Sequence, residues 1–109
     1  MGGEGVKHIV LAKFKDDVSE EKINEFIKNY SDLVNLIEPL KAFQWGTELS
    51  ASNMDQGFSH VFESSFESVQ GLNEFVSDSH HIAFGKSYAS IFDKLVIFDY
   101  NPTIISYPN

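Results

Sequence analysis

The spacing of apolar residues changes along the chain, from every second position to every third or fourth and back again. Alternation over residues 6–14 predicts a strand, and the spacing from Ile23 to Ile37 predicts a helix over residues 20–38. The chain then predicts two strands, a short helix, a second helical stretch and a last strand, at residues 42–49, 58–66, 67–76, about 80–92 and 94–100. The order β-α-β-β-α-β predicts a ferredoxin-like α+β fold with a four-stranded antiparallel sheet.

Length and composition limit the classes of function. A chain of 109 residues is expected to form one domain over residues 1–109, with its core at about residues 5–102. The net charge is -8 and all basic residues are Lys, which argues against binding nucleic acid. The chain has no Cys, no apolar run of about 20 residues and no N-terminal pattern of a signal peptide. We therefore expect a cytoplasmic protein without membrane association.

The sheet is expected to have two apolar faces, although the helices of this topology cover only one of them. The uncovered face would carry six large apolar side chains: Ile9, Leu11, Val61, Val96, Phe98 and Tyr100. A face of this kind is too apolar to leave in water. It predicts a homodimer in which two copies pack sheet to sheet, as a dimeric α/β barrel.

His8 and Asp99 form the first candidate for chemistry. Both are expected on the helix-facing side of the sheet, on adjacent antiparallel strands and near the same end. A carboxylate that holds one imidazole nitrogen fixes the tautomer and makes the ring a usable general base. The spacing is equally compatible with a polar pair that only joins two strand ends.

The other histidines have weaker patterns. His81 follows a break in the helical pattern at residues 77–79, where a polar side chain can face a pocket or simply cap a helix. His80 is its neighbour and would point about 100° away on a helix, so one metal ion is not expected between them. His60 lies among apolar residues, as a hydrogen-bonded core histidine does. No metal site and no cofactor are predicted.

Several segments carry a family resemblance that covers about residues 5–102. They are Val6-Lys7-His8-Ile9-Val10-Leu11, Asn35-Leu36-Ile37, Trp45-Gly46, Gly57-Phe58-Ser59-His60, Phe66-Glu67-Ser68-Val69 and Lys94-Leu95-Val96-Ile97-Phe98-Asp99-Tyr100. Together they resemble the plant stress-responsive A/B barrel (Dabb) proteins. The resemblance implies a small ferredoxin-like homodimer. It also implies two kinds of relative, heat-stable stress proteins and a polyketide cyclase that closes a linear tetraketide thioester by an aldol reaction.

The resemblance also implies a site. By this comparison His81 is the general base of the cyclase and His8 the strand-one histidine, while Phe75 stands where the cyclase has an assisting tyrosine. Asp99 corresponds to a polar partner of His8 at the edge of a ligand pocket. The other positions that correspond to this pocket are Val10, Ala12, Phe26, Tyr30, Phe62, Phe84, Gly85, Phe92, Leu95 and Ile97. The chain also reads Asp78-Ser79-His80-His81 where relatives commonly read His-Pro-Ala-His.

Two hypotheses follow. In the first, the protein is a non-catalytic stress-responsive dimer that has an incidental cavity or binds an apolar small molecule between sheet and helices. In the second, it is a polyketide-cyclase-like enzyme with His81 as base. Phe75 lacks the hydroxyl that would hold a substrate carbonyl, which favours the first hypothesis for the cyclase reaction itself. The sequence leaves open whether the protein is an enzyme.

Overall fold

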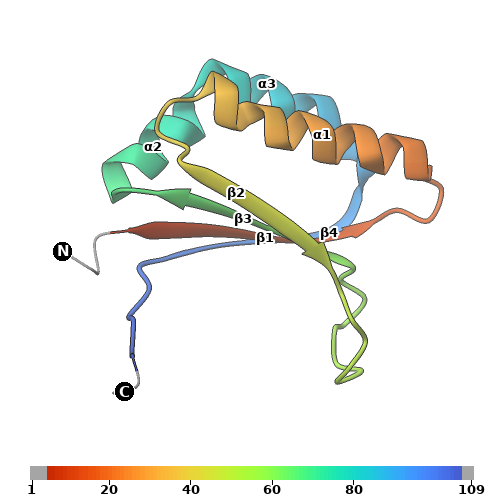
Figure 1. Ribbon diagram of the computed structural model, residues 1–109. Coiled ribbons are helices and arrows are strands. Elements are labelled where there is room, and N and C mark those ends of the chain that lie inside the picture. The colour runs from red at the N-terminus through yellow and green to blue at the C-terminus, as the bar shows by residue number, and fades with distance from the viewer. Residues whose placement is uncertain (1–4, 107–109) are drawn as a thin grey trace.

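The computed structural model describes residues 5–106 as a four-stranded antiparallel sheet with its helices on one face (Figure 1). Residues 1–4, which belong to the segment considered for a signal peptide, and residues 107–109 lie outside the described range. The elements are β1 (Val6–Phe14), α1 (Glu20–Leu36), β2 (Ala42–Thr47), β3 (His60–Phe66), α2 (Val69–Ser77), α3 (Ser79–Tyr88), the 3-10 turn η1 (Ala89–Ile91) and β4 (Phe92–Tyr100). The predicted ferredoxin-like α+β fold is therefore confirmed.

The strand order is β2-β3-β1-β4, so β1 is central and β4 is an edge strand. His8 lies directly opposite Ser64 on β3 and Asp99 on β4. Burial alternates along β1, with every second residue from Val6 to Phe14 buried against the helices. Because the pairing fixes which side each residue takes, the helix-facing positions of β4 are Leu95, Ile97 and Asp99, as predicted.

Helix α1 begins where the sequence predicts and ends two residues early. The Ser19 side chain caps it by accepting a hydrogen bond from the Lys22 amide at 3.1 Å. The helix ends at Leu36 rather than residue 38, because Ile37 takes an extended conformation (φ -123°, ψ 103°). Ile37 is itself buried, and its amide still donates to the Leu33 carbonyl. Pro39 thus follows the helix end without being the residue that sets it.

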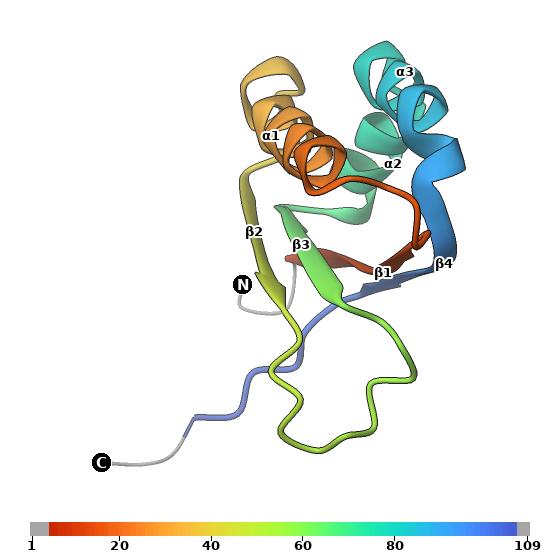
Figure 2. The same cartoon turned by 90° about the vertical axis from the view of Figure 1, so that its right-hand side faces the viewer.

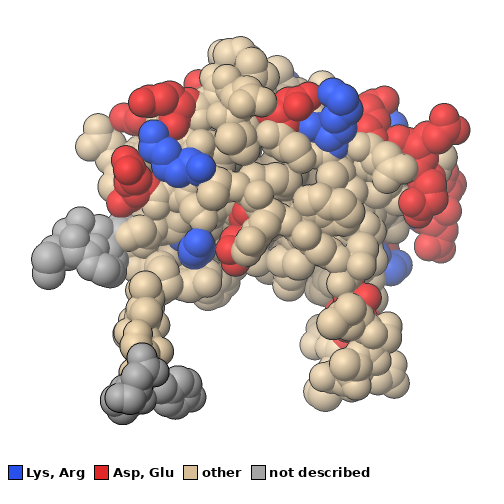
Figure 3. Space-filling model, viewed as in Figure 1, with Lys and Arg blue, Asp and Glu red and all other residues tan. Residues whose placement is uncertain are grey.

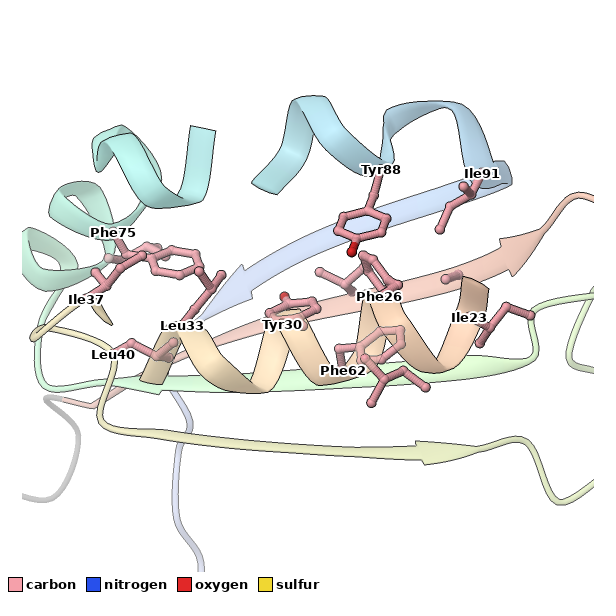
Figure 4. Packing of buried hydrophobic residues seen from close by; sticks show 14 of the residues in the cluster. Ile23, Phe26, Tyr30, Leu33, Ile37, Leu40, Phe62, Phe75, Tyr88 and Ile91 are labelled. Carbon is pink, nitrogen blue, oxygen red and sulfur yellow. The ribbon is translucent and has the colours of Figure 1, made fainter. Parts of the chain in front are cut away.

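The core lies between the sheet and the helices and is rich in aromatic rings (Figure 4). Phe26 of α1 contacts Phe62 of β3 edge to face, with centroids 5.4 Å apart. Tyr30, one turn further along α1, stacks on the same Phe62 ring at 5.3 Å. Phe62 is completely buried. This part of the interior is therefore occupied by side chains.

The strand bounds differ from the prediction at the β2–β3 connection. The strands end at Thr47 and begin again at His60, so the predicted bounds of residues 49 and 58 were wrong. The loop between them places Ser50, Asn53 and Gln56 in the left-handed region, with φ of 53° to 61°, which an extended strand does not allow. β4 instead begins two residues early, at Phe92, where the register against β1 shifts.

Helices α2 and α3 meet at Asp78, which ends the first and caps the second. Its carboxylate accepts a hydrogen bond from the His80 amide at 2.8 Å, so the predicted break at residues 77–79 is a single residue. Helix α2 begins at Val69, two residues later than predicted, because Ser68 is its cap. The apolar spacing of this helix predicts that Val69, Leu72, Phe75 and Val76 all point inward, and for Val69 and Val76 this prediction is wrong. Both are about half exposed, since this short helix buries only the stripe that carries Leu72 and Phe75.

The opposite face of the sheet has no helix over it (Figure 2). The loop at residues 48–59 and the segment after β4 both project from this side, as two ridges with few charges in the view of Figure 3. Carboxylates gather instead at the other side, where the exposed Asp16, Asp17, Glu20 and Glu21 surround the start of α1. Over residues 5–106, no helix is long and apolar enough to cross a bilayer.

Candidate functional site

His8 and Asp99 are joined as the sequence predicts. The Nδ1 atom of His8 donates to Oδ1 of Asp99 at 2.5 Å. The His8 side chain is buried while that of Asp99 is 44% exposed, so the pair runs from the interior to the surface at the edge strand. Because Nδ1 carries the bonded proton, the neutral ring keeps its lone pair on Nε2.

Phe75 connects His8 to His81. Its ring lies edge-on to the imidazole of His8 at 5.8 Å and tilted against that of His81 at 4.3 Å, centroid to centroid. Phe75 is completely buried and comes from α2, whereas His8 comes from β1 and His81 from α3. The three side chains that the sequence places in the site therefore lie together.

His81 is held in one tautomer by the turn between the two helices. Its Nδ1 lies 3.1 Å from the carbonyl oxygen of Val76, which can only accept a hydrogen bond, so Nδ1 carries the proton. The lone pair is then on Nε2. Burial lowers the pKa of His81 below its ordinary value of 6.5, although the Val76 hydrogen bond opposes this effect. A neutral imidazole with a free Nε2 can accept a proton near neutral pH.

The residues expected to line a pocket divide into a buried and an uncovered group. The buried group packs in the interior and consists of Val10, Ala12, Phe26, Tyr30, Phe62 and Phe75. The uncovered group, on α3 and β4, is half-buried or exposed and consists of Phe84, Gly85, Phe92, Leu95, Ile97 and Asp99. Exposed apolar side chains on the helix-facing side of the sheet are therefore found on β4, beside the partly exposed helix α3.

Gly85 has open space beside it. It lies one turn after His81 on the same side of α3, and a Cβ atom built on it would meet no atom within 4 Å. Leu95 and Ile97 are 44% and 56% exposed, although they share a sheet face with the buried Ala12 and Val10. The helices do not extend across the edge strand, which leaves these apolar side chains without cover.

Two hydroxyl groups belong to the same interior, and one of them was not singled out from the sequence. Ser64 is completely buried opposite His8, and its Oγ makes no hydrogen bond within the described residues. Tyr30 is also buried, and burial raises the pKa of its phenol to about 12. The alternation of His60, Phe62, Ser64 and Phe66 along β3 was the signal that could have placed Ser64 on the helix-facing side.

His60 lies away from this group. Its Nδ1 is 2.7 Å from the hydroxyl of Ser59, and its ring packs edge to face on Phe14, but the side chain is only partly buried, so His60 lies at the edge of the core and not within it as predicted. Burial lowers the pKa of His60. His60 also borders a cavity of about 660 Å³ under the loop at residues 48–59, whose floor includes Leu11 and Val61. This cavity is on the helix-free side, not between the sheet and the helices.

The described part of the chain holds no cluster of three or more His, Asp or Glu side chains that is arranged to bind a metal ion. The histidines that come together instead face aromatic and aliphatic side chains. The fold and this site define a small ferredoxin-like protein with an imidazole pair beside an apolar layer. Residues 6–102 match the sequence profile of the Stress responsive A/B Barrel Domain (Dabb). The chain belongs to this family.

Similar proteins include both stress proteins and an enzyme. The chain is 50% identical to the stress-response A/B barrel domain-containing protein HS1 of Arabidopsis thaliana, over 93% of each chain. It is 40% identical to olivetolic acid cyclase of Cannabis sativa, over 89% of this chain and 96% of the cyclase.

Two solved structures add a second enzyme and a dimer. The hydroxynitrile lyase of Passiflora edulis superposes with a TM-score of 0.88 at 30% identity, over 97% of this chain and 99% of the lyase. A protein of Thermobifida fusca, described as dimeric and ferredoxin-like, superposes with a TM-score of 0.77 at 20% identity, over 92% of each chain. The family therefore includes enzymes, so a catalytic role is possible for a chain of this fold.

Proposed function

We propose that the protein binds a small, mainly apolar carbonyl compound beside His81, between α3 and the helix-facing side of β4. The observation that carries this proposal is the exposed apolar surface of Leu95 and Ile97 on the helix-facing side of β4, where the helices do not cover the edge strand. Covering about 100 Å² of such a surface contributes about 2.5 kcal/mol to binding. His81 and the buried hydroxyls supply the few polar groups that orient a ligand in a site of this kind.

Benzaldehyde is a suitable first probe, because it combines a small apolar ring with one carbonyl group. We expect a titration followed by amide NMR to shift signals of α3 and β4. A Gly85→Leu variant should fill the open space and weaken binding, whereas Gly85→Ala should bind as the wild type does. Shifts confined to the loop at residues 48–59, or equal binding by Gly85→Leu, would contradict this location.

A second function, general base catalysis, is favoured by the tautomer of His81. With Nδ1 bonded to Val76, Nε2 can take a proton from a carbon next to a carbonyl, and the enolate that results can add to a second carbonyl group to form a carbon–carbon bond. The similarity to a cyclase and to a hydroxynitrile lyase supports the proposal only in showing that enzymes occur among the similar proteins. For this chain the polyketide cyclase reaction stays a proposal, and Phe75 counts against it.

Proton exchange tests this function without a known substrate. The α-hydrogens of phenylacetone are measured by NMR in deuterated buffer, with wild type, His81→Gln and His80→Gln. We expect wild type and His80→Gln to accelerate exchange equally and His81→Gln to match buffer. The neighbouring, more exposed His80 is the matched control. If all three proteins exchange at the same rate, His81 is not a base and the binding function stands alone.

We also infer that the protein is a homodimer through its helix-free face. The face is apolar across β1, β3 and β4, where Phe98 is 61% exposed, and its charges at Lys7 and Glu63 already pair with each other at 3.7 Å. A second copy offers the same mainly apolar surface. The predicted cytoplasmic location and lack of nucleic-acid binding stay predictions from composition.

A further inference from the structure

Ser64 has a buried polar atom that the fold leaves without a partner. Its side chain is 0% exposed. Among the buried side-chain oxygen and nitrogen atoms of residues 5–106, Ser64 Oγ is the one without a hydrogen bond of ordinary length. Almost all buried polar groups in proteins are hydrogen-bonded, because an unpaired one destabilises the folded state. A hydroxyl kept at this cost therefore needs an explanation.

The position of Ser64 links it to the site. Ser64, His8 and Asp99 lie side by side on three neighbouring strands, all on the helix-facing side. The row is open at one end only, since the Asp99 side chain is 44% exposed while His8 and Ser64 are buried. Asp99 is thus the member of the row nearest to solvent, and Ser64 lies deepest.

Tyr30 of α1 lies in the middle of the core, between Phe26 and Leu33 along the helix (Figure 4). Its phenol is close enough to the Ser64 hydroxyl for that group to oppose the burial that raises the pKa of Tyr30 to about 12. The phenol therefore stays protonated near neutral pH. Ser64 and Tyr30 each have a proton available for an acceptor oxygen.

The rest of the site is short of donors. His81 offers a lone pair at Nε2, and its one N–H is used by Val76. The Nδ1 proton of His8 is likewise used by Asp99. Phe75, which contacts both rings, has no hydroxyl. A carbonyl oxygen entering this interior would have to accept its hydrogen bond from Ser64 or Tyr30.

We propose that the Ser64 hydroxyl, assisted by Tyr30, donates the hydrogen bond that holds the carbonyl oxygen of the bound ligand. This inference rests on the proposed binding of a carbonyl compound and names the group that recognises it. In the free protein the phenol of Tyr30 lies beside this hydroxyl, and a ligand oxygen would be the acceptor that both donors share. Ser64 thereby supplies a donor that Phe75 does not, from another strand and another direction.

The test compares Ser64→Ala with Ser65→Ala. Ser65 is the adjacent residue on the opposite face, where its hydroxyl accepts a hydrogen bond from Lys7 at 2.7 Å. Each protein is melted without ligand and then titrated with benzaldehyde and with styrene, which has a CH₂ group in place of the carbonyl oxygen. We expect Ser64→Ala to keep or raise the melting temperature, to bind benzaldehyde about three- to tenfold more weakly and to bind styrene unchanged.

A Ser64→Cys variant keeps the size of the side chain with a weaker donor, and its benzaldehyde affinity should fall between those of wild type and Ser64→Ala. A melting temperature of Ser64→Ala clearly below that of Ser65→Ala would overturn the proposal, because the hydroxyl would then have a partner inside the protein. An unchanged benzaldehyde-to-styrene ratio overturns the donor role alone. If wild type binds neither probe, the proposed function fails and the donor role fails with it.

Discussion

The ring of Phe75 lies 4.3 Å from the imidazole of His81, centroid to centroid, and the Phe75 side chain is completely buried. The family resemblance assigns a tyrosine to this position in the cyclase. The aromatic scaffold of such a site is thus present here, and one oxygen atom is missing from it. Whether that oxygen decides the reaction can be tested by adding it.

We expect Phe75→Tyr to close a linear tetraketide by the aldol reaction much faster than the wild type does. A hydrogen-bond donor that stabilises a developing oxyanion contributes about 3 kcal/mol, or roughly a hundredfold in rate. The substrate is made in the reaction mixture by a type III polyketide synthase, and the carboxylate-retaining product is quantified by mass spectrometry. Phe75→Tyr combined with His81→Ala is the control and should return to the protein-free level. Equal product from wild type and Phe75→Tyr would show that the hydroxyl is not limiting.

His81 should titrate below pH 6.5 and make stability depend on pH. Because burial lowers its pKa in the folded state, the unfolded chain binds more protons as the pH falls. The stabilising contribution of neutral His81 is present above about pH 6.5 and is lost as the pH falls through the folded-state pKa. NMR titration of the imidazole gives the midpoint. The stability advantage of wild type over His81→Gln in urea should shrink from about pH 7.5 to about pH 5, and a midpoint at or above 6.5 would contradict the prediction.

Breaking the His8–Asp99 hydrogen bond should cost more than breaking a surface pair. We expect Asp99→Asn to lower the free energy of unfolding by about 1 kcal/mol, since the bond joins a buried ring to a half-exposed carboxylate. Asp93→Asn is the matched control, because Asp93 is on β4 like Asp99 and pairs with Lys13 of β1 at 2.7 Å. Both side chains of this pair are more exposed than that of His8. Its cost should stay below about 0.5 kcal/mol. Urea unfolding measures both, and equal losses would refute a special role for the buried pair.

A charge on the helix-free face should separate the dimer. We expect wild type to sediment at twice the chain mass of 12.3 kDa and Phe98→Lys to sediment as a monomer. Burying an unpaired ammonium costs about 3 kcal/mol or more, which weakens association by roughly a hundredfold. Ile97→Lys adds the same charge to the opposite side of β4 and should remain dimeric. A monomeric wild type, or a dimeric Phe98→Lys, would show that copies do not meet through this face.

The pairing of His8 with Asp99 illustrates what the sequence could predict. Alternation assigned each strand residue to a face, and the order of strands made β1 and β4 neighbours, so the two side chains had to meet. The same reasoning predicted the helix-facing side of β4. It did not predict that Leu95 and Ile97 are uncovered, because a periodic pattern carries no information on how far a helix layer extends across a sheet.

Val69, Val76 and Ser64 show two other limits. The apolar spacing of α2 predicted four inward residues, but a nine-residue helix that touches the sheet on one side has room to bury only two of them. Ser64 gave no hydrophobic signal, although its neighbours on alternate positions did. The polar groups of the site are therefore harder to predict from the sequence than its apolar residues, because a single Ser gives no pattern that distinguishes a buried hydroxyl from an exposed one.

The turn at Asp78 has a consequence for how this site can vary. From Val76, whose carbonyl fixes His81, to His81 itself is a stretch of six residues held by one side-chain cap. The tautomer of the base is thus encoded locally and does not depend on strands that are distant in the chain. Insertion of a single residue into this stretch would rotate His81 by about 100° out of register with Phe75. Sequence change in the strands can alter the apolar surroundings of His81, whereas change within this short stretch alters the hydrogen bond that sets its tautomer.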